Sequence, residues 1–277
     1  MSAQREHLDK QEQMKLVQER FTRTVTVFSD YALIERASEA ERLLKLLRLA
    51  GSERALDVAC GPGTLARVFW KSVKQICGLD LTPAMLNRAY KAAVDERIEN
   101  FQPVCGNALG MPFRDESFDL VVTSYSIHHI PDASATFREF KRVLRRDGKI
   151  GLIDMVVPEN PAYGEACNRI ERSRDASHTR ALPISEFKSV LASSGFRVRA
   201  TETEEHPRSF DHWMHVAGWK RGDAPYEETR RLLEASIPGD SAGLRPKVLQ
   251  EPSKEAPDSR PDLEIVHTAV FIAAEKQ

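Results

Sequence analysis

The sequence predicts an α/β protein built on a doubly wound parallel sheet with helices on both faces. Three observations predict this class. Short apolar runs alternate with segments of helical periodicity from residue 54 to residue 157. The run at 118–124 is almost continuously apolar, which is typical of a strand covered on both faces. A glycine-containing turn at 60–63 separates the first apolar run from the helical segment behind it.

The first fifty residues are expected to be helical. Between Met14 and Phe28, apolar side chains recur at spacings of three and four, which places them on one face of a helix. Four leucines between residues 43 and 47 indicate a second helix, and Gly51 is the residue type that often follows a helix C-terminus. This pattern predicts a helical lid over residues 1–50.

The next hundred residues alternate strand and helix. Pro83 stands where it would begin a helix, and Gly148 lies just after the end of another. Because strands that alternate with helices form parallel sheets, these segments define the central sheet. Strands are expected at 55–59, 75–80, 101–105, 118–124 and 150–157, with helices after residues 63, 82 and 136.

The remaining segments complete the predicted domain of residues 51–277. A helix over 182–194, followed by Gly195, leads into a strand at 196–204, and a last strand is expected at 263–272. Residues 222–262 contain six of the fifteen prolines, so the part after Ser236 is expected to be a long insertion before the last strand.

Composition excludes several classes of function. The chain is 41% hydrophobic and 29% charged, and 40 basic against 41 acidic residues give a net charge of −1. Such a balance disfavours a nucleic-acid partner, and no run approaches the apolar length of a membrane span. The polar N-terminal segment lacks the apolar core of a signal peptide, so a cytoplasmic protein is expected. The four cysteines form no CxxC pair, and no metal site is expected.

Two acidic residues mark the expected ligand site at the carboxyl ends of the strands. Asp57 ends the first strand just before the loop that contains Gly61 and Gly63, where a backbone can approach a ligand closely. Asp80 ends the second strand, 19 residues beyond Gly61, where an acid can accept both hydroxyls of a ribose. Because Asp57 would repel a pyrophosphate, the pair favours a nucleoside that carries positive charge.

Four motifs resemble a known family. They are LDVACGPG at 56–63, GLDLTPAML at 78–86, GNALGMPFRDESFDLVVTSYSIHHIPD at 106–132 and FKRVLRRDGKIGLID at 140–154. In order and spacing they resemble class I S-adenosylmethionine-dependent methyltransferases. The similarity is greatest to the small-molecule branch (methyltransferase type 11) that includes ubiquinone and menaquinone methyltransferases. The resemblance implies a Rossmann-like, seven-stranded sheet with an antiparallel last strand.

The resemblance also implies how S-adenosylmethionine would bind. Ala59 stands where the family usually has a glycine, and Asn107 where it often has an aspartate, but Ala59 is small and Asn107 keeps a carbonyl oxygen. The methionine end of the cofactor would lie on the first loop, and its ribose would contact the acid after the second strand. Its adenine would lie beside the next two loops, and its sulfonium near the end of the fourth strand. The implied cofactor residues are Tyr31, Asp57, Ala59, Cys60, Gly61, Gly63, Asp80, Leu81, Met85, Asn107, Ala108 and Ser124.

Three histidines are candidates for a general base. A sulfonium methyl is already activated, so a base is needed only when the attacking group of the acceptor is protonated. His128 and His129 follow the fourth strand, and imidazole titrates near neutral pH. His178 lies in RDASHTR (174–180), which resembles a stretch on the acceptor side of some family members. A structural role for each histidine, and a solvated charged loop at 174–180, are the competing interpretations.

The acceptor is expected to be a small molecule, methylated on oxygen, nitrogen or carbon. The N-terminal helix and the region after the fifth strand supply aromatic and methionine side chains that suit a phenol or a quinone, although core packing also explains them. A monomer and a homodimer both remain open. The expected acceptor residues are Phe21, Phe28, Tyr31, Asp154, Met155, Tyr163, His178, Phe210, Trp213, Met214 and Trp219.

Three other functions remain open. A nucleoside-cofactor oxidoreductase is disfavoured because the chain lacks a G-x-G-x-x-G turn. A non-catalytic S-adenosylmethionine-binding sensor or scaffold protein could keep the same fold and the same acids. An RNA methyltransferase is disfavoured by the near-neutral charge.

Overall fold

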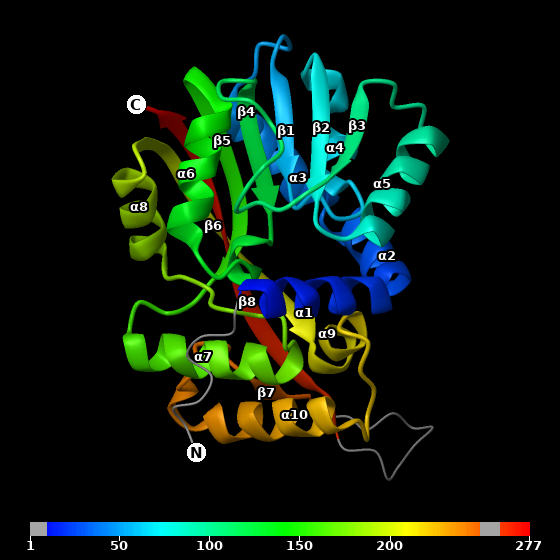
Figure 1. Ribbon diagram of the computed structural model, residues 1–277. Coiled ribbons are helices and arrows are strands. Elements are labelled where there is room, and N and C mark those ends of the chain that lie inside the picture. The colour runs from blue at the N-terminus through cyan, green and yellow to red at the C-terminus, as the bar shows by residue number, and fades with distance from the viewer. Residues whose placement is uncertain (1–9, 250–260) are drawn as a thin grey trace.

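The computed structural model describes residues 10–249 and 261–277 and is organised around one twisted sheet (Figure 1). The strands follow the order β3-β2-β1-β4-β5-β8-β6, and the short β7 pairs with β8. The strands are β1 (Arg54–Val58), β2 (Gln75–Asp80), β3 (Phe101–Cys105), β4 (Phe118–Ser124), β5 (Leu144–Val156), β6 (Phe196–Ser209), β7 (Lys247–Val248) and β8 (Leu263–Lys276).

Strand direction confirms the expected fold class. β1 pairs in parallel with β2 on one side and with β4 on the other. β2 pairs in parallel with β3, and β4 pairs in parallel with β5. β8 runs antiparallel to both β5 and β6, so the last strand lies between two strands that precede it in the chain. β6 is longer than expected because it continues past β5 and pairs with the start of β8 in a two-stranded extension over which the lower helices pack. β8 is longer because residues 273–276 continue its pairing within the sheet.

Helices cover both faces of the sheet and its lower edge in Figure 1. α1 lies across the carboxyl ends of the parallel strands, and α7 and α10 lie below it around the extension of β6 and β8. The helices are α1 (Lys10–Arg23), α2 (Val25–Glu35), α3 (Ala37–Leu47), α4 (Thr64–Phe69), α5 (Pro83–Asp95), α6 (Ala133–Val143), α7 (Pro161–Arg174), α8 (Ile184–Ser193), α9 (Phe210–Val216) and α10 (Ala224–Ser236).

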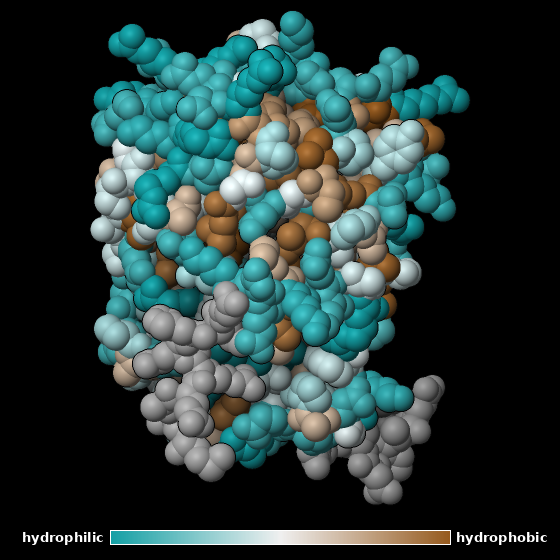
Figure 2. Space-filling view, in the orientation of Figure 1, coloured by the Kyte–Doolittle hydropathy of each residue, from teal (hydrophilic) through white to brown (hydrophobic). Residues whose placement is uncertain are grey.

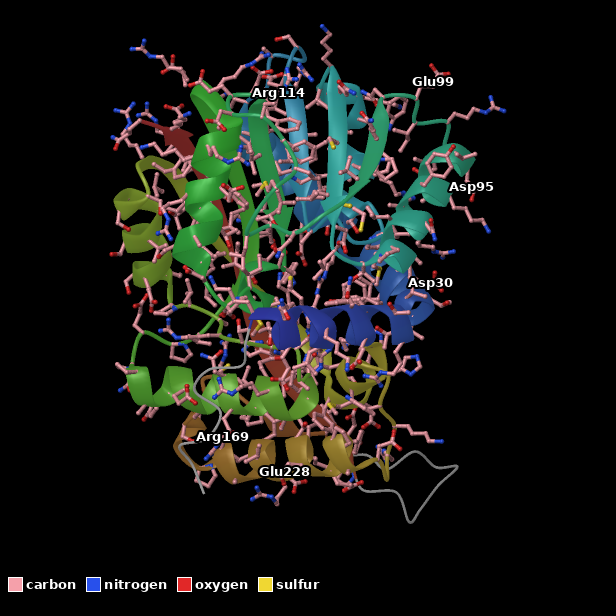
Figure 3. The ribbon with its side chains drawn as sticks, viewed as in Figure 1. Asp30, Asp95, Glu99, Arg114, Arg169 and Glu228 are labelled. Atoms are coloured by element: carbon pink, nitrogen blue, oxygen red, sulfur yellow. The ribbon has the colours of Figure 1, made fainter. Side chains whose placement is uncertain are left out.

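The N-terminal segment differs from the continuous helical face that its periodicity predicts. The helix breaks at Thr24, between α1 and α2. The Thr24 hydroxyl donates to the Arg20 carbonyl oxygen at 3.0 Å, and the Arg20 guanidinium is drawn into an ion pair with Asp175. These buried bonds redirect the chain, so α1 crosses the strand ends while α2 turns beside α5, where Asp30 pairs with Arg88 (Figure 3).

The end of α3 corrects a second expectation. The helix ends at Leu47, and Arg48 takes the left-handed conformation that the sequence assigns to Gly51. Leu43 and Leu47 are fully buried against the sheet, so α3 within residues 1–50 packs as a core helix. The left-handed turn at Arg48 directs the chain back to β1 as soon as this apolar face has ended.

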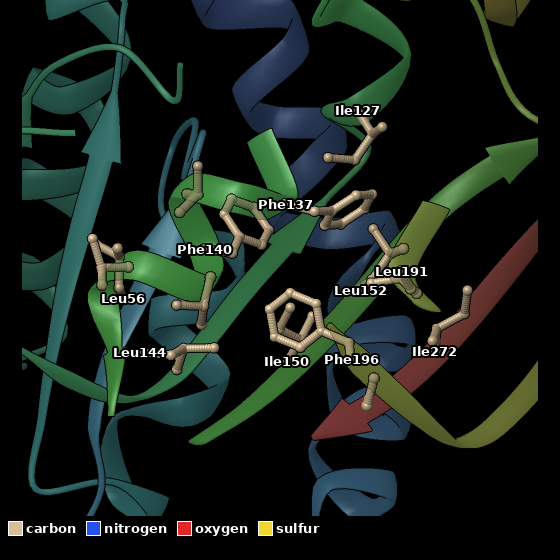
Figure 4. Close-up of a cluster of buried hydrophobic side chains, with 14 of the residues drawn as sticks. Leu56, Ile127, Phe137, Phe140, Leu144, Ile150, Leu152, Leu191, Phe196 and Ile272 are labelled. Carbon is tan, nitrogen blue, oxygen red and sulfur yellow. The ribbon is translucent and has the colours of Figure 1, made fainter. Parts of the chain in front are cut away.

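Three clusters of buried side chains hold the layers together. The largest fills the sheet face under α6 and α8, where Phe137, Phe140 and Phe196 pack on Ile150 (Figure 4). A second joins α3 and α4 to the opposite face, and a third lies among α7, α9, α10 and β8. Each buried phenylalanine contributes ~1.5–3 kcal/mol, so the clusters fix the strand ends that carry the site.

Residues 222–249 are more ordered than the proline content indicates. α10 packs on α7, with Tyr226 and Leu233 buried in the third cluster. Beyond it, Leu244 is also buried, and its carbonyl oxygen accepts from the Val266 amide of β8 at 2.8 Å. Part of the predicted insertion after Ser236 therefore belongs to the packed structure, while residues 250–260 lie outside the described residues.

Candidate active site

The loops after β1 and β2 come together as the sequence predicts. Ala59, Gly61 and Gly63 all have positive φ, at 55°, 53° and 89°. The Asp80 carboxylate accepts from the amide of Gly61 at 2.8 Å and from the amide of Thr82 at 2.8 Å. This acid therefore ties both loops into one rigid surface. Glycine relieves the backbone strain at two of the three positions, whereas Ala59 retains it.

The Asp57 carboxylate is the most exceptional group at the strand ends. It is 1% exposed, and neither oxygen has a hydrogen-bond partner in the described part of the chain. Burial raises the pKa of Asp57 well above its usual value, and the nearby Asp80 raises it further. A buried, unpaired carboxylate is unfavourable unless a cation or hydrogen-bond donors reach it.

A pocket opens above these loops and is called here the loop pocket. Its floor is formed by the loops after β1, β2, β3 and β4, and α1 and α2 cover it. Figure 2 shows hydrophobic residues gathered across the middle of this face, near the strand ends, below a hydrophilic upper rim. Nine of the expected cofactor residues line the loop pocket: Ala59, Cys60, Gly61, Asp80, Leu81, Met85, Asn107, Ala108 and Ser124.

Three expected cofactor residues lie elsewhere. Asp57 is beneath the loop and outside the lining. Gly63 faces α5, where an added Cβ would lie 3.2 Å from that of Ala89, so this glycine permits helix packing. Tyr31 lines a second pocket, because α2 turns it toward Arg208, whose guanidinium donates to its hydroxyl at 3.3 Å.

Asn107 and the roof of the loop pocket are held together. The Asn107 side-chain oxygen accepts from the Leu109 amide at 2.9 Å, and its nitrogen lies 2.9 Å from the Met14 sulfur on α1. Gln18 on α1 donates to the Leu81 carbonyl oxygen at 2.9 Å. These contacts place α1 directly over the pocket.

The second pocket, the polar chamber, lies beyond the loop pocket among α2, α3, α7, α9, β6 and β8. The two pockets share one wall, the collar, made of Phe21, Phe28, Arg36, Tyr125 and His129. Tyr125 has a positive φ of 49°, and the Arg36 guanidinium lies 3.7 Å from the centre of its ring. A strained aromatic residue at the junction of two pockets is typical of a functional position.

Unpaired polar atoms are concentrated in the polar chamber. Six of its side chains carry a buried nitrogen or oxygen that has no hydrogen-bond partner among the described residues. Buried polar atoms in proteins are normally paired, so such a concentration indicates a ligand surface. The six atoms are Arg36 Nε, Glu39 Oε2, Tyr125 OH, His206 Nε2, Arg208 Nε and His267 Nδ1.

The three candidate histidines gather on one side of the chamber and differ in their partners. The His128 Nδ1 lies 2.5 Å from Asp154, a fully buried carboxylate that also accepts from the amides of Ile127 and Met155. The His178 Nε2 is 2.7 Å from the Asn168 side-chain oxygen, and burial holds the pKa of His178 well below its usual value.

His129 belongs to the collar. Its Nδ1 lies 3.0 Å from the Ser177 carbonyl oxygen, and its ring packs edge-on against Phe21. Burial, together with the neighbouring His128, lowers the pKa of His129 to about 4. His129 is therefore neutral at physiological pH. Among the three candidate histidines, His128 alone combines a carboxylate partner on one ring nitrogen with a position on the chamber wall.

The expected acceptor residues divide into three groups. Phe21, Phe28, Tyr31, Met155, His178 and Trp213 line the chamber, together with Arg174 and Asp175 of the RDASHTR segment. Asp154 lies behind His128, and Phe210, Met214 and Trp219 pack in or against the third hydrophobic cluster. Tyr163 is 41% exposed on α7, because α7 turns it away from the chamber.

Sequence reasoning missed the residues that give the chamber its polarity. Arg36 and Glu39 come from the N-terminal helices, and His206, Arg208 and His267 come from the extension of β6 and β8. His206 pairs directly with His267 across the two strands, so both side chains lie on one face. The alternating polar residues of 202–208 were the available signal, since one face of that strand is charged throughout.

Metal-binding clusters and membrane-spanning helices are both absent from the described residues. Within residues 10–249 and 261–277, no group of three or more histidine, cysteine or acidic side chains is arranged to hold a metal ion. No helix in those ranges has the length and apolarity that crossing a bilayer requires.

Comparison with known proteins identifies relatives. Residues 56–152 match the family described as a methyltransferase domain. The chain is 28% identical over 213 residues to the uncharacterized methyltransferase YcgJ of Bacillus subtilis, covering 77% of this chain and 82% of that protein. The crystal structure of YcgJ superimposes with a TM-score of 0.78 at 26% identity, covering 87% of this chain and 99% of that one.

Two relatives have named acceptors. A demethylmenaquinone methyltransferase of Lactobacillus johnsonii is 33% identical over 125 residues, 44% of this chain and 51% of that protein. A 27-O-demethylrifamycin SV methyltransferase of Amycolatopsis mediterranei is 30% identical over 178 residues, 62% of this chain and 64% of that protein.

Proposed function

We propose that this chain, which belongs to the class I S-adenosylmethionine-dependent methyltransferases, transfers a methyl group from S-adenosylmethionine to a small-molecule acceptor. The observation that carries the proposal is the collar at which two pockets of different chemistry meet. In a group-transfer enzyme, the transferred group of the donor must meet the accepting atom of the acceptor. The collar is where the two pockets meet.

The residues around the loop pocket fit the cofactor. The unpaired Asp57 carboxylate suits the positively charged methionine end, and the positive-φ backbone from Ala59 to Gly63 lets that end approach closely. Asp80 keeps lone pairs for the ribose hydroxyls in addition to its two backbone bonds. Leu81 and Met85 supply apolar surface for an adenine ring.

The bound cofactor would supply a methyl group that its sulfonium already activates. The chain's own contribution is to align the acceptor and to exclude water. Alignment of this kind is worth ~7–11 kcal/mol on the scale of intramolecular reactions. Phe21, Phe28 and Tyr125 form an apolar ring around the junction, and α1 covers it from outside.

His128 is the proposed general base. In the orientation that the structure gives the ring, Nδ1–H donates to Asp154, which leaves Nε2 free to accept a proton on the chamber side. Asp154 is held by two backbone amides, so it fixes both the tautomer and the direction of the ring. His129 and His178 would keep structural roles in the wall.

The named relatives support a small organic acceptor. Menaquinone precursors and a rifamycin are both organic molecules outside the nucleic-acid and protein classes. The two enclosed pockets and the net charge of −1 agree with such a substrate.

The first test is a thermal-shift comparison of S-adenosylmethionine, S-adenosylhomocysteine and NADH. A ligand at 100 times its Kd stabilises by ~2.7 kcal/mol, which raises Tm by several degrees for a chain of this size. We expect a shift with the two sulfur nucleosides alone. A shift with NADH instead would contradict the assignment.

Turnover needs a second measurement. Transfer of labelled methyl groups from S-adenosylmethionine into a metabolite extract separates an enzyme from a non-catalytic sensor or scaffold. We expect the label in a small organic product. Tight cofactor binding without any transferred label, over extracts from several sources, would support the sensor.

A further inference from the structure

We propose that the polar chamber binds a methyl acceptor that carries an anionic oxygen group, and that Arg208 and Arg36 hold this group. The inference rests on the proposed function and names the class of its acceptor. Such an acceptor differs from a purely lipophilic quinone, which would leave the unpaired polar atoms of the chamber buried against hydrocarbon.

Two of the four arginines around the chamber are already neutralised. Arg20 pairs with Asp175 at 2.9 Å, and both side chains are almost fully buried. Arg174 lies 3.8 Å from Glu171, whose other oxygen is 2.8 Å from the His267 ring. These pairs satisfy the charges on the α7 side, so they leave no free charge for a ligand.

Arg208 has no carboxylate partner in the described part of the chain. Its guanidinium donates to the Tyr31 hydroxyl at 3.3 Å, and its Nε is buried without a partner among the described residues. A guanidinium presents its donors as a planar fork that matches a carboxylate or phosphate. The same alternation of β6 that points His206 into the chamber points Arg208 there, two residues further along the strand.

Arg36 faces the same space from the helical side. Its guanidinium is stacked between aromatic rings, 3.7 Å from the centre of Tyr125 and 4.9 Å from that of Tyr31, and its Nε is unpaired. Glu39, one helical turn later, is the nearest acid, but one of its oxygens is also unpaired and the other lies 3.6 Å from His206. Arg208 on β6 and Arg36 on the helical side thus each bring an unpaired guanidinium Nε to the chamber, with Glu35 and Glu39 as the acids on the helical side.

The chamber also offers unpaired acceptors. His267 uses Nε2 toward Glu171, and burial lowers the pKa of His267, so the neutral ring presents Nδ1 as an acceptor. With Glu39 Oε2, this atom suits a hydroxyl or amine on the ligand. The matched class is a small acid, either a carboxylate or a phosphate ester, that also bears a hydroxyl or amine, of which an aromatic hydroxy acid is an example.

The test compares two probes of equal shape and different charge. The protein is saturated with S-adenosylhomocysteine and titrated with benzoate or with benzamide, and Tm is recorded. Inorganic phosphate is the third probe: competition with benzoate points to a general oxyanion site, and lack of competition points to a carboxylate site. We expect benzoate to raise Tm at concentrations at which benzamide has little effect.

The variants decide the role of Arg208. Arg208→Gln should weaken benzoate binding by about tenfold or more, and Arg208→Lys should retain part of it. Arg231→Gln is the matched control, because Arg231 is exposed on α10 and paired with Glu228 (Figure 3). Each variant should keep the wild-type response to S-adenosylhomocysteine, which reports an intact fold.

Equal responses to benzoate and benzamide, or a benzoate response that survives Arg208→Gln unchanged, would overturn the inference. A wild-type chain that does not respond to S-adenosylhomocysteine would instead contradict the proposed function. The two failures are therefore separate in one data set.

Discussion

The loop pocket and the polar chamber share a collar but are built in different ways. The loop pocket is made from loops that follow consecutive strands, and its key contacts involve backbone groups such as the Gly61 and Thr82 amides. The chamber is made from side chains on elements far apart in sequence, from Arg36 to His267. The cofactor end of the site is thus a property of the fold's topology, and the acceptor end is a property of particular side chains.

The largest expected effect comes from the chamber. His128→Gln should lower kcat by about 10²–10⁴-fold, the range for loss of a general base, and should leave the thermal response to S-adenosylhomocysteine unchanged, because His128 lies outside the loop pocket. Initial rates of methyl transfer from labelled S-adenosylmethionine measure kcat. His215→Gln, on the exposed side of α9, is the control. Wild-type turnover in the His128 variant would show that the chamber supplies no base.

Asp80→Ala should weaken cofactor binding in the loop pocket, whereas His128→Gln should leave cofactor binding unchanged. Loss of its two backbone bonds and of the ribose contact should weaken cofactor binding by ~1–3 kcal/mol, measured by calorimetry. Asp95→Ala, at the periphery of α5 (Figure 3), should bind as the wild type does. An unchanged dissociation constant for the Asp80 variant would mean that the ribose lies elsewhere.

A pair of glycine substitutions separates backbone strain from packing. Gly63→Ala and Gly51→Ala both place an alanine at positive φ, at 89° and 86°, but only the first brings a Cβ within 3.2 Å of Ala89. Both should lose about 1 kcal/mol of unfolding free energy, and Gly63→Ala about 1 kcal/mol more. Urea titration measures both. Equal losses would show that α4 and α5 separate without cost.

The smallest expected effect is the pH dependence of Asp57. Because burial raises the pKa of Asp57 in the folded state, its contribution to stability is full below the unfolded pKa of about 4 and is lost as pH rises through the folded value. Asp57→Asn should therefore be more stable relative to the wild type at pH 8 than at pH 4, without cofactor. Denaturant titration at the two pH values checks this, and a constant difference would contradict the buried, unpaired state.

The contrast between the pockets also explains what the sequence could predict. The alternation of apolar runs and helical segments predicted β1 to β4 closely, and the acids at 57 and 80 marked the loop pocket, because strand order and loop position follow from local patterns. The antiparallel β8 was expected from the family resemblance, and the structure confirms it.

The chamber could not be predicted in the same way. Tyr31 was expected both at the cofactor and in the acceptor wall, and it lies in the chamber alone, since a break at Thr24 sets the direction of α2. Aromatic residues line the chamber as expected, but polar side chains line it as well, because the extension of β6 and β8 brings His206, Arg208 and His267 beside Arg36. These partners are joined by pairing between strands separated by more than fifty residues, a relation that no local pattern records.

The position of β8 has a consequence for biosynthesis. β8 lies between β5 and β6, although it is made 263 − 209 = 54 residues after the end of β6. A chain that emerges from the ribosome N-terminus first can pair β1 to β5, but the free edge of β5 has no partner until β8 appears. α9 lines the acceptor chamber and packs on both β6 and β8, so the chamber is the last part of the protein to form. During translation that edge must be kept from other chains, as exposed strand edges are prone to join one another.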